Sequence, residues 1–310
     1  MYHLSTKMRR TILAASVALL TTSTALVPPR TGAGRIVRGG RPLGPKFLKD
    51  LGFEKPSFLP DFGRGDDKPA EVQLEDVEPA PLGPANAAAG AVFAGLVAWS
   101  FGFAPGELGN PADTQLIELL VTQPVPRPES VNELWFAVWN SFAVVPLAIA
   151  ALTLPAASRG QRLPAAPFLV GSAAFGYFAL GPYFATRSAR TEAPLAPDED
   201  FGFFTKNIFE TRAFGVALAA LSASIPVSSD LLAADPKTLV AGFVELASSS
   251  RFVAVASADI GIMSVLAALL VAEDAARRGW DAYRVPLAAA SLLLPVLGPS
   301  LYLAARPRIE

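Results

Sequence analysis

The sequence predicts an all-α fold, a multi-pass transmembrane helix bundle of about six spans that follows a disordered N-terminal arm. Of the 310 residues, 52% are hydrophobic and only 17% are charged, and the mean hydropathy is +0.39. Because soluble domains carry about 25% charged residues, this chain is too apolar to be one. The apolar residues come in blocks of about 20, which is the length a helix needs to cross a bilayer core.

The first 49 residues have the composition of a targeting presequence. They contain nine Lys or Arg and no Asp or Glu, and targeting segments are basic and poor in acidic residues. A basic start before the apolar run 11–20 is typical of a secretory signal, and the basic stretch 30–49 is typical of a transit peptide. This order resembles the bipartite presequence of plastids acquired by secondary endosymbiosis. The alternative is a first membrane anchor, for which the apolar run is short.

Three further segments complete the predicted organisation. Residues 50–84 form an acidic, Pro-rich soluble arm, which is expected to be disordered because it cannot bury enough apolar surface. Residues 85–305 form the transmembrane domain, and 306–310 form a C-terminal tail.

Six apolar stretches predict the spans, because helices satisfy their own backbone in lipid. They are 85–103, 131–154, 163–186, 211–232, 252–272 and 285–305. Two shorter amphipathic stretches, 112–122 and 238–249, are expected to lie on the membrane surface.

Orientation and symmetry follow from the six-span arrangement. It places eight Lys or Arg near each membrane face, so the positive-inside rule does not orient the chain. The sequences LGPY at 180–183 and LGPS at 297–300 indicate a repeat of two three-helix units. Because three is odd, such units have opposite orientations, as in many transporters.

Composition restricts the chemistry. The chain has no Cys, and its single His, His3, lies in the presequence. This excludes disulfides, zinc-thiolate sites, Fe–S clusters and a thiol nucleophile. No phosphate-binding loop, HExxH, EF-hand or GxSxG pattern is present, and no basic, aromatic cluster indicates nucleic-acid binding. The acidic loop 198–200 is expected to be solvated rather than to hold a cation. We therefore expect no enzyme, metal site, cofactor or nucleic-acid partner.

Two stretches resemble a known family. One includes RGQRLP at 159–164 and FGYFALGPYFATR at 175–187, and the other includes SRFV at 250–253, AARRGW at 275–280 and LGPSLY at 297–302. They resemble uncharacterised integral membrane proteins of cyanobacteria and plant chloroplasts, whose C-terminal part is related to the small DUF2834 membrane proteins. The resemblance covers roughly 131–307 and implies a photosynthetic membrane, but no catalytic role. Its motif residues here are Gly181, Pro182, Tyr183, Arg187, Arg251, Gly298, Pro299 and Tyr302.

Asp259 is the candidate functional residue. It follows Arg251 by eight residues and so lies roughly 12 Å into the fifth predicted span, where an Asp costs about 2.5–3.5 kcal/mol on insertion scales. Two interpretations stay open: a polar contact between helices, or a carboxylate that binds a proton or cation and faces a cavity. The expected intramembrane partners are Asn140, Ser257 and Tyr177, with Arg212 as the nearest charged group.

Three functions are compatible with these observations. The first is an accessory or assembly partner of a photosynthetic membrane complex in a plastid membrane, either thylakoid or inner envelope. The presequence, the soluble arm and the absence of catalytic residue types favour it. The second is a protein that translocates protons or a small solute with its intramembrane carboxylate. A membrane enzyme acting on lipids or isoprenoids is disfavoured because paired polar clusters are missing.

Overall fold

The computed structural model describes residues 81–157, 161–188 and 202–308, and these belong to one compact unit. The predicted presequence, most of the soluble arm and the acidic loop 198–200 lie outside the described residues. All regular elements within the described ranges are helical, which confirms the all-α prediction for this part of the chain. In chain order they are α3 (Pro84–Gly102), α4 (Pro111–Thr122), α5 (Glu133–Ser141), α6 (Val145–Thr153), α7 (Ala165–Thr186), η2 (Thr205–Phe209), α8 (Arg212–Ser228), α9 (Pro236–Ser249), α10 (Arg251–Arg277), η3 (Asp281–Tyr283), α11 (Arg284–Leu293) and α12 (Leu297–Ala305).

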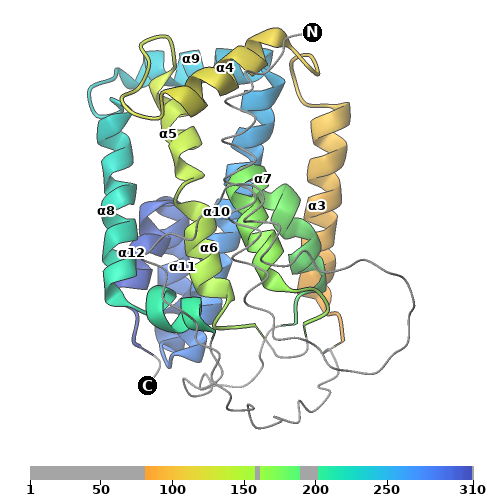
Figure 1. The fold of residues 1–310 in the computed structure, drawn as a ribbon, viewed down its shortest axis with the longest axis vertical. Helices are drawn as coiled ribbons and strands as arrows, with labels where there is room; N and C mark the ends of the chain where they lie inside the picture. Colours follow the sequence, from red (N-terminus) through yellow and green to blue (C-terminus); the bar gives the residue numbers. More distant parts are fainter. Residues whose placement is uncertain (1–80, 158–160, 189–201, 309–310) are drawn as a thin grey trace, which may run out of the picture. The chain divides into compact units, whose positions relative to one another are not determined.

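Four helical segments of the described chain are long and apolar enough to cross a membrane, not six. They are α3, α5 with α6 (Glu133–Thr153), α7 and α10. α8 has 17 residues, about 25 Å of helix, and in Figure 1 it runs beside α5 from η2 to the level of α9. α7 has the length and composition of a span, but it turns back at its centre.

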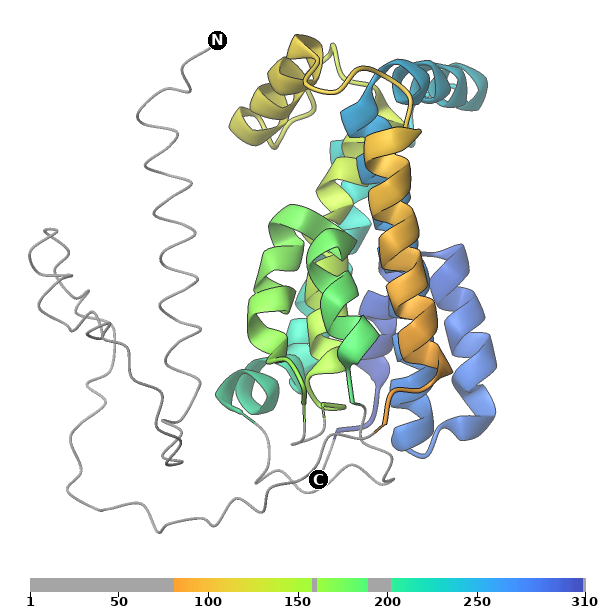
Figure 2. The ribbon, with the colours of Figure 1, turned by 90° about the vertical axis from the view of Figure 1, so that its right-hand side faces the viewer.

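α7 is a helical hairpin. Gly176 interrupts it with φ 52° and ψ −131°. Across this turn, a Cβ on Gly171 would lie 3.3 Å from the Cβ of Ala179, eight residues further on. At the other end of the hairpin, the backbone N–H of Ser188 donates to Oε1 of Gln161 at 3.2 Å. The chain therefore enters and leaves at the same end of the bundle, and Figure 2 shows the two limbs side by side.

α11 and α12 form a second hairpin where a sixth span was expected. They have 10 and 9 residues, each too short to cross a bilayer alone. A Cβ on Gly298 would meet the backbone of Ser291 on the opposite limb. The prediction of six spans is therefore not confirmed: 163–186 and 285–305 form hairpins in the structure, and apolar length does not reveal a reversal of chain direction.

The helices repeat the same order twice, in the same orientation. Each unit has a long helix, a short helix across its end, a second long helix and a hairpin: α3, α4, α5–α6 and α7, then α8, α9, α10 and α11–α12. The two short helices begin alike, with the side chain of Asn110 or Asp235 as N-cap and Pro at the next position.

Contacts follow the repeat as well. α3 packs on α7 as α8 packs on α12, and α6 packs on α10 between the units. Gly90 lies against Ala185 in the first pair, and Gly215 lies against the backbone of Ala304 in the second. The expectation of an inverted repeat was wrong, because two crossings and a hairpin leave each unit pointing the same way. Parallel repeats of this kind occur in some transporters.

Basic residues gather at one end of the described bundle, the end where both hairpins begin and finish, here called the hairpin end. Nine Lys or Arg of the described chain lie there, and three lie at the opposite end, beside α4 and α9, here called the α4–α9 end. The first group is Arg162, Arg187, Lys206, Arg212, Arg277, Arg278, Arg284, Arg306 and Arg308, and the second is Arg127, Lys237 and Arg251. The equal division expected from six spans was a consequence of the incorrect topology.

Candidate functional site

Asp259 joins α10 to the turn of the α7 hairpin. Its side chain is 4% exposed, and its Oδ1 accepts the backbone N–H of Tyr177 at 2.6 Å. Tyr177 is the first residue after the reversal, so its N–H belongs to the open N-terminal turn of the second limb. Such N–H groups lack a partner within their own helix. Asp259 therefore caps this limb from a neighbouring helix, about a third of the way along α10.

Gly176 allows this contact. Its φ of 52° lies in the region that glycine occupies without steric cost. A Cβ at this position would overlap the carboxylate of Asp259.

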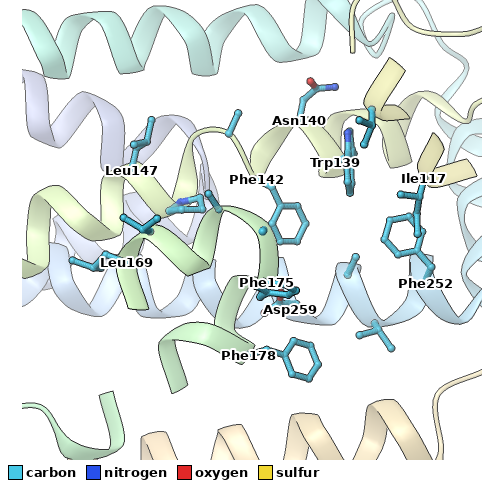
Figure 3. A pocket seen from close by; sticks show the side chains of 18 of the residues that line it. Ile117, Trp139, Asn140, Phe142, Leu147, Leu169, Phe175, Phe178, Phe252 and Asp259 are labelled. Atoms are coloured by element: carbon cyan, nitrogen blue, oxygen red, sulfur yellow. The ribbon is translucent and has the colours of Figure 1, made fainter. Parts of the chain in front are cut away.

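Asp259 faces a cleft of about 1500 Å³ in the bundle. Its lining comes mainly from α4, α5, α6, α7 and α10 and is largely apolar. Figure 3 shows Phe142, Phe175 and Phe178 around Asp259, with Trp139 and Phe252 further along the same cleft. The ring centroids of Trp139 and Phe252 are 5.8 Å apart, and those of Trp139 and Phe142 are 6.2 Å apart. The carboxylate thus lies beside a wall of aromatic side chains.

A second interruption borders the same cleft. The second span of the first unit is broken between α5 and α6, where Phe142, Ala143 and Val144 form turns. Pro146 follows in the first turn of α6 and lacks the N–H that a continuous helix would use. Both broken elements of the first unit, the α5–α6 junction and the tip of α7, therefore contribute side chains to the cleft around Asp259.

The structure places the four expected partners of Asp259 differently. Tyr177 does bind it, but through the backbone N–H, since its phenol donates to the carbonyl of Ala89 at 3.0 Å. Asn140 lines the cleft, but its Nδ2 donates to Phe136 of its own helix at 2.9 Å. The hydroxyl of Ser257 is buried and has no hydrogen-bond partner among the described residues. Arg212 lies exposed at the start of α8, at the hairpin end.

The remaining charged residues of the cleft lie at the α4–α9 end. The guanidinium of Arg251 donates hydrogen bonds to the backbone carbonyls of Gly106 and Ala104, at 3.0 and 2.8 Å. Asp113 accepts the hydroxyl of Ser250 at 2.6 Å and the N–H of Phe252 at 3.1 Å. These contacts fix the start of α10 against the connection from α3 and the first turn of α4, so both charges have structural roles.

A buried ion-pair network, here called the Arg278 network, lies at the hairpin end. It comprises Glu210, Asp274, Arg278, Tyr302 and Arg306. Arg278 pairs with Glu210 and Asp274, each at 2.8 Å, and Arg306 pairs with the same two carboxylates at 2.8 and 2.9 Å. Tyr302 donates its phenol to Asp274 at 2.8 Å. Burial by itself lowers the pKa of the Arg278 guanidinium, but Asp274 and Glu210 together raise this pKa above its usual value, so Arg278 stays charged.

The family-like residues lie at helix contacts and in ion pairs. Gly181 packs against the ring of Phe93, and Gly298 packs inside the second hairpin. Tyr183 is fully buried, and its phenol interacts with the guanidinium of Arg187. The others are Pro182 within α7, Pro299 in the first turn of α12, Arg187 paired with Glu273, Arg251 on backbone carbonyls and Tyr302 in the Arg278 network. None of these residues binds Asp259.

Two features of the site were absent from the sequence-based prediction. The first is Gly176, whose position at the centre of an apolar stretch is the sequence signal for the reversal. The second is Ser100, which lines the cleft and is 5% exposed, with a hydroxyl that has no hydrogen-bond partner in the part of the chain that the structure describes. The resemblance to cyanobacterial and chloroplast membrane proteins stays a prediction, since comparison with family models, curated proteins and solved structures finds no match to this chain.

Proposed function

We propose that this chain is a membrane carrier that translocates protons or a small solute with Asp259 as its intramembrane carboxylate. The observation that carries the proposal is the position of Asp259. It is buried about a third of the way along α10, beside the tip of a re-entrant hairpin, and it faces a large cleft. Ionisable residues inside a membrane generally line substrate or ion pathways.

The repeat supports the same proposal. Transporters often consist of two related units with discontinuous helices, and their binding sites lie near the bilayer centre at those discontinuities. Here each unit holds a hairpin, and the α7 hairpin meets α10 of the other unit at Asp259. Asp259 therefore lies at a contact between the two units, where a movement of one unit relative to the other would change the surroundings of the carboxylate.

The alternative is that Asp259 only caps the hairpin. A cap needs one acceptor atom, and Oδ1 supplies it. It does not need a cleft of about 1500 Å³ beside it. The two interpretations make different predictions for Asp259→Asn, because Asn retains an acceptor for the N–H of Tyr177 and loses only the ionisable group.

The experiment uses the purified full chain in proteoliposomes that contain a pH-sensitive dye. A potassium gradient with valinomycin drives protons inward, and the rate of acidification is measured for the wild type, Asp259→Asn and Glu118→Gln. Glu118 is exposed on α4 and does not line the cleft. Glu118→Gln is therefore the control, because it also removes one carboxylate but leaves the cleft unchanged.

We expect the wild type and Glu118→Gln to acidify at equal rates, and Asp259→Asn to fall to the rate of empty vesicles while it stays folded. Equal rates in the wild type and Asp259→Asn, or no acidification above empty vesicles by any variant, would contradict proton translocation by Asp259. A role as accessory partner of a photosynthetic complex, and location in a plastid, stay predictions from the sequence, because they rest on the presequence and the family resemblance.

A further inference from the structure

We infer that the Asp259 cleft binds a lipophilic cation, an organic molecule whose positive charge is surrounded by apolar or aromatic groups. This inference names the substrate class of the proposed carrier and so rests on the proposed function. It follows from three properties of the cleft: aromatic walls, one deep carboxylate and a net negative charge.

The walls select an apolar molecule. Phe142, Phe175 and Phe178 surround the carboxylate in Figure 3, and they come from the α5–α6 junction and the α7 hairpin. Phe175 is 68% exposed at the hairpin tip, so its ring is available to a ligand. Aromatic faces attract cations through their quadrupole, and most strongly where water is excluded.

The charge selects a cation. Three carboxylates line the cleft, those of Glu107, Asp113 and Asp259, against one guanidinium, that of Arg251. The guanidinium of Arg251 donates to backbone carbonyls, and the carboxylate of Asp113 accepts an N–H from the first turn of α10. Asp259 is therefore the charged residue of the lining that lies deepest in the bundle. A buried carboxylate loses its hydration and is stabilised by a partner of opposite sign.

Only one of the two carboxylate oxygens of Asp259 accepts a hydrogen bond from the described chain. Oδ1 is engaged by the N–H of Tyr177, whereas within the described chain Oδ2 receives no hydrogen bond. The cleft is larger than the roughly 300–1,000 Å³ of a typical small-molecule site, so it has room for a bulky cation next to Asp259. The hydroxyl of Ser100, buried and without a partner, adds a polar contact in the lining of the same cleft.

The experiment compares two probes of the same shape and opposite charge, tetraphenylphosphonium and tetraphenylborate. Binding of radiolabelled tetraphenylphosphonium to the full chain in lipid nanodiscs is measured by equilibrium dialysis, with empty nanodiscs as background. The variants are Asp259→Asn, Phe175→Ala and the control Glu118→Gln.

We expect saturable tetraphenylphosphonium binding that Asp259→Asn weakens at least about tenfold and that Phe175→Ala weakens about three- to tenfold. Glu118→Gln should bind like the wild type, and tetraphenylborate should not displace the cation. Phe175→Ala keeps the test informative if Asp259→Asn folds poorly, because Phe175 is exposed.

Equal binding by the wild type and Asp259→Asn would overturn the inference, as would displacement by tetraphenylborate, which would indicate an uncharged lipid-type groove. The result is independent of the flux assay. Proton flux that depends on Asp259, without tetraphenylphosphonium binding, refutes the substrate class and keeps the carrier. Binding that depends on Asp259, without proton flux, keeps the cation site and refutes proton translocation.

Discussion

Glu273 of α10 binds both terminal nitrogens of Arg187, at 3.0 Å for Nη1 and 2.7 Å for Nη2. Because Arg187 ends α7, this pair fixes the base of the hairpin to α10, while Asp259 fixes its tip to the same helix. Fourteen residues, about 21 Å of helix, separate the two attachment points on α10. The α7 hairpin is therefore attached to α10 at both its tip and its base, although the two belong to different repeats.

Substitution of Gly176 should disrupt the tip of the hairpin. In Gly176→Ala the new Cβ overlaps the carboxylate of Asp259 and the backbone is strained at φ 52°. We expect the free energy of unfolding to fall by about 3 kcal/mol, the sum of backbone strain and a lost charged hydrogen bond. The measurement is unfolding in mixed micelles by titration with SDS. Gly261→Ala is the control, since a Cβ on Gly261 meets no atom within 4 Å.

Loss of the hydrogen-bond acceptor at residue 259 should lower the free energy of unfolding more than loss of the negative charge alone. Asp259→Ala leaves the N–H of Tyr177 buried and unpaired, which should lower the free energy of unfolding by about 1–3 kcal/mol. Asp259→Asn keeps an acceptor and should lose less than about 1 kcal/mol in the same assay. If the two variants lose the same free energy, the bond from Tyr177 contributes nothing to the fold.

The sequence predicts the positions of the helices along the chain much better than the direction in which each helix runs through the bundle. The six predicted stretches coincide with helical segments of the described chain, and both surface helices are present as α4 and α9. Hydropathy does not distinguish one helix of 20 residues from two of 10 that fold back, so both hairpins were interpreted as spans. The LGP sequences lie in the second limb of each hairpin, at 180–182 and 297–299. They therefore indicated the repeat, but not the relative orientation of its two units.

The candidate site was predictable only in part, for a related reason. An Asp in a long apolar stretch is visible in the sequence, and so is its depth. Its partner is a backbone N–H that becomes available only because the chain reverses at Gly176. Asn140 was expected to bind Asp259 because it lies at a similar depth, but its side chain bonds to its own helix.

The Arg278 network should be sensitive to loss of one partner. Arg306 is 3% exposed, pairs with Glu210 and Asp274 and donates to the carbonyl of Phe209 at 2.9 Å. Its substitution by Ala leaves buried carboxylates with only Arg278 as their cation. We expect Arg306→Ala to lower the free energy of unfolding by about 3–5 kcal/mol.

The matched control for this substitution is Arg284→Ala. Arg284 pairs with Asp281 at 3.4 Å, and both side chains are more than half exposed. Exposed pairs contribute little, so we expect a change of less than about 0.5 kcal/mol in the same SDS titration. Similar losses for the two variants would mean that the Arg278 network does not hold the second hairpin in place.

Single cysteines can test the topology directly, since the chain contains no Cys. The structure places exposed Arg162 and Asp281 at the hairpin end, and exposed Glu129 and Lys237 at the α4–α9 end. We expect a membrane-impermeant maleimide to label Cys variants at 162 and 281 from one side of sealed vesicles. Variants at 129 and 237 should be labelled only from the other side.

The same labelling separates the two topologies and also orients the chain. Six spans would place 162 and 281 on opposite sides, and likewise 129 and 237, because three crossings would separate each pair. The distribution of basic residues, nine at the hairpin end against three, predicts that 162 and 281 face the compartment from which the chain is inserted. Labelling of 162 and 281 from opposite sides would show that α7 crosses the membrane and does not fold back at Gly176. The attachment of Asp259 to a hairpin tip would then be wrong as well.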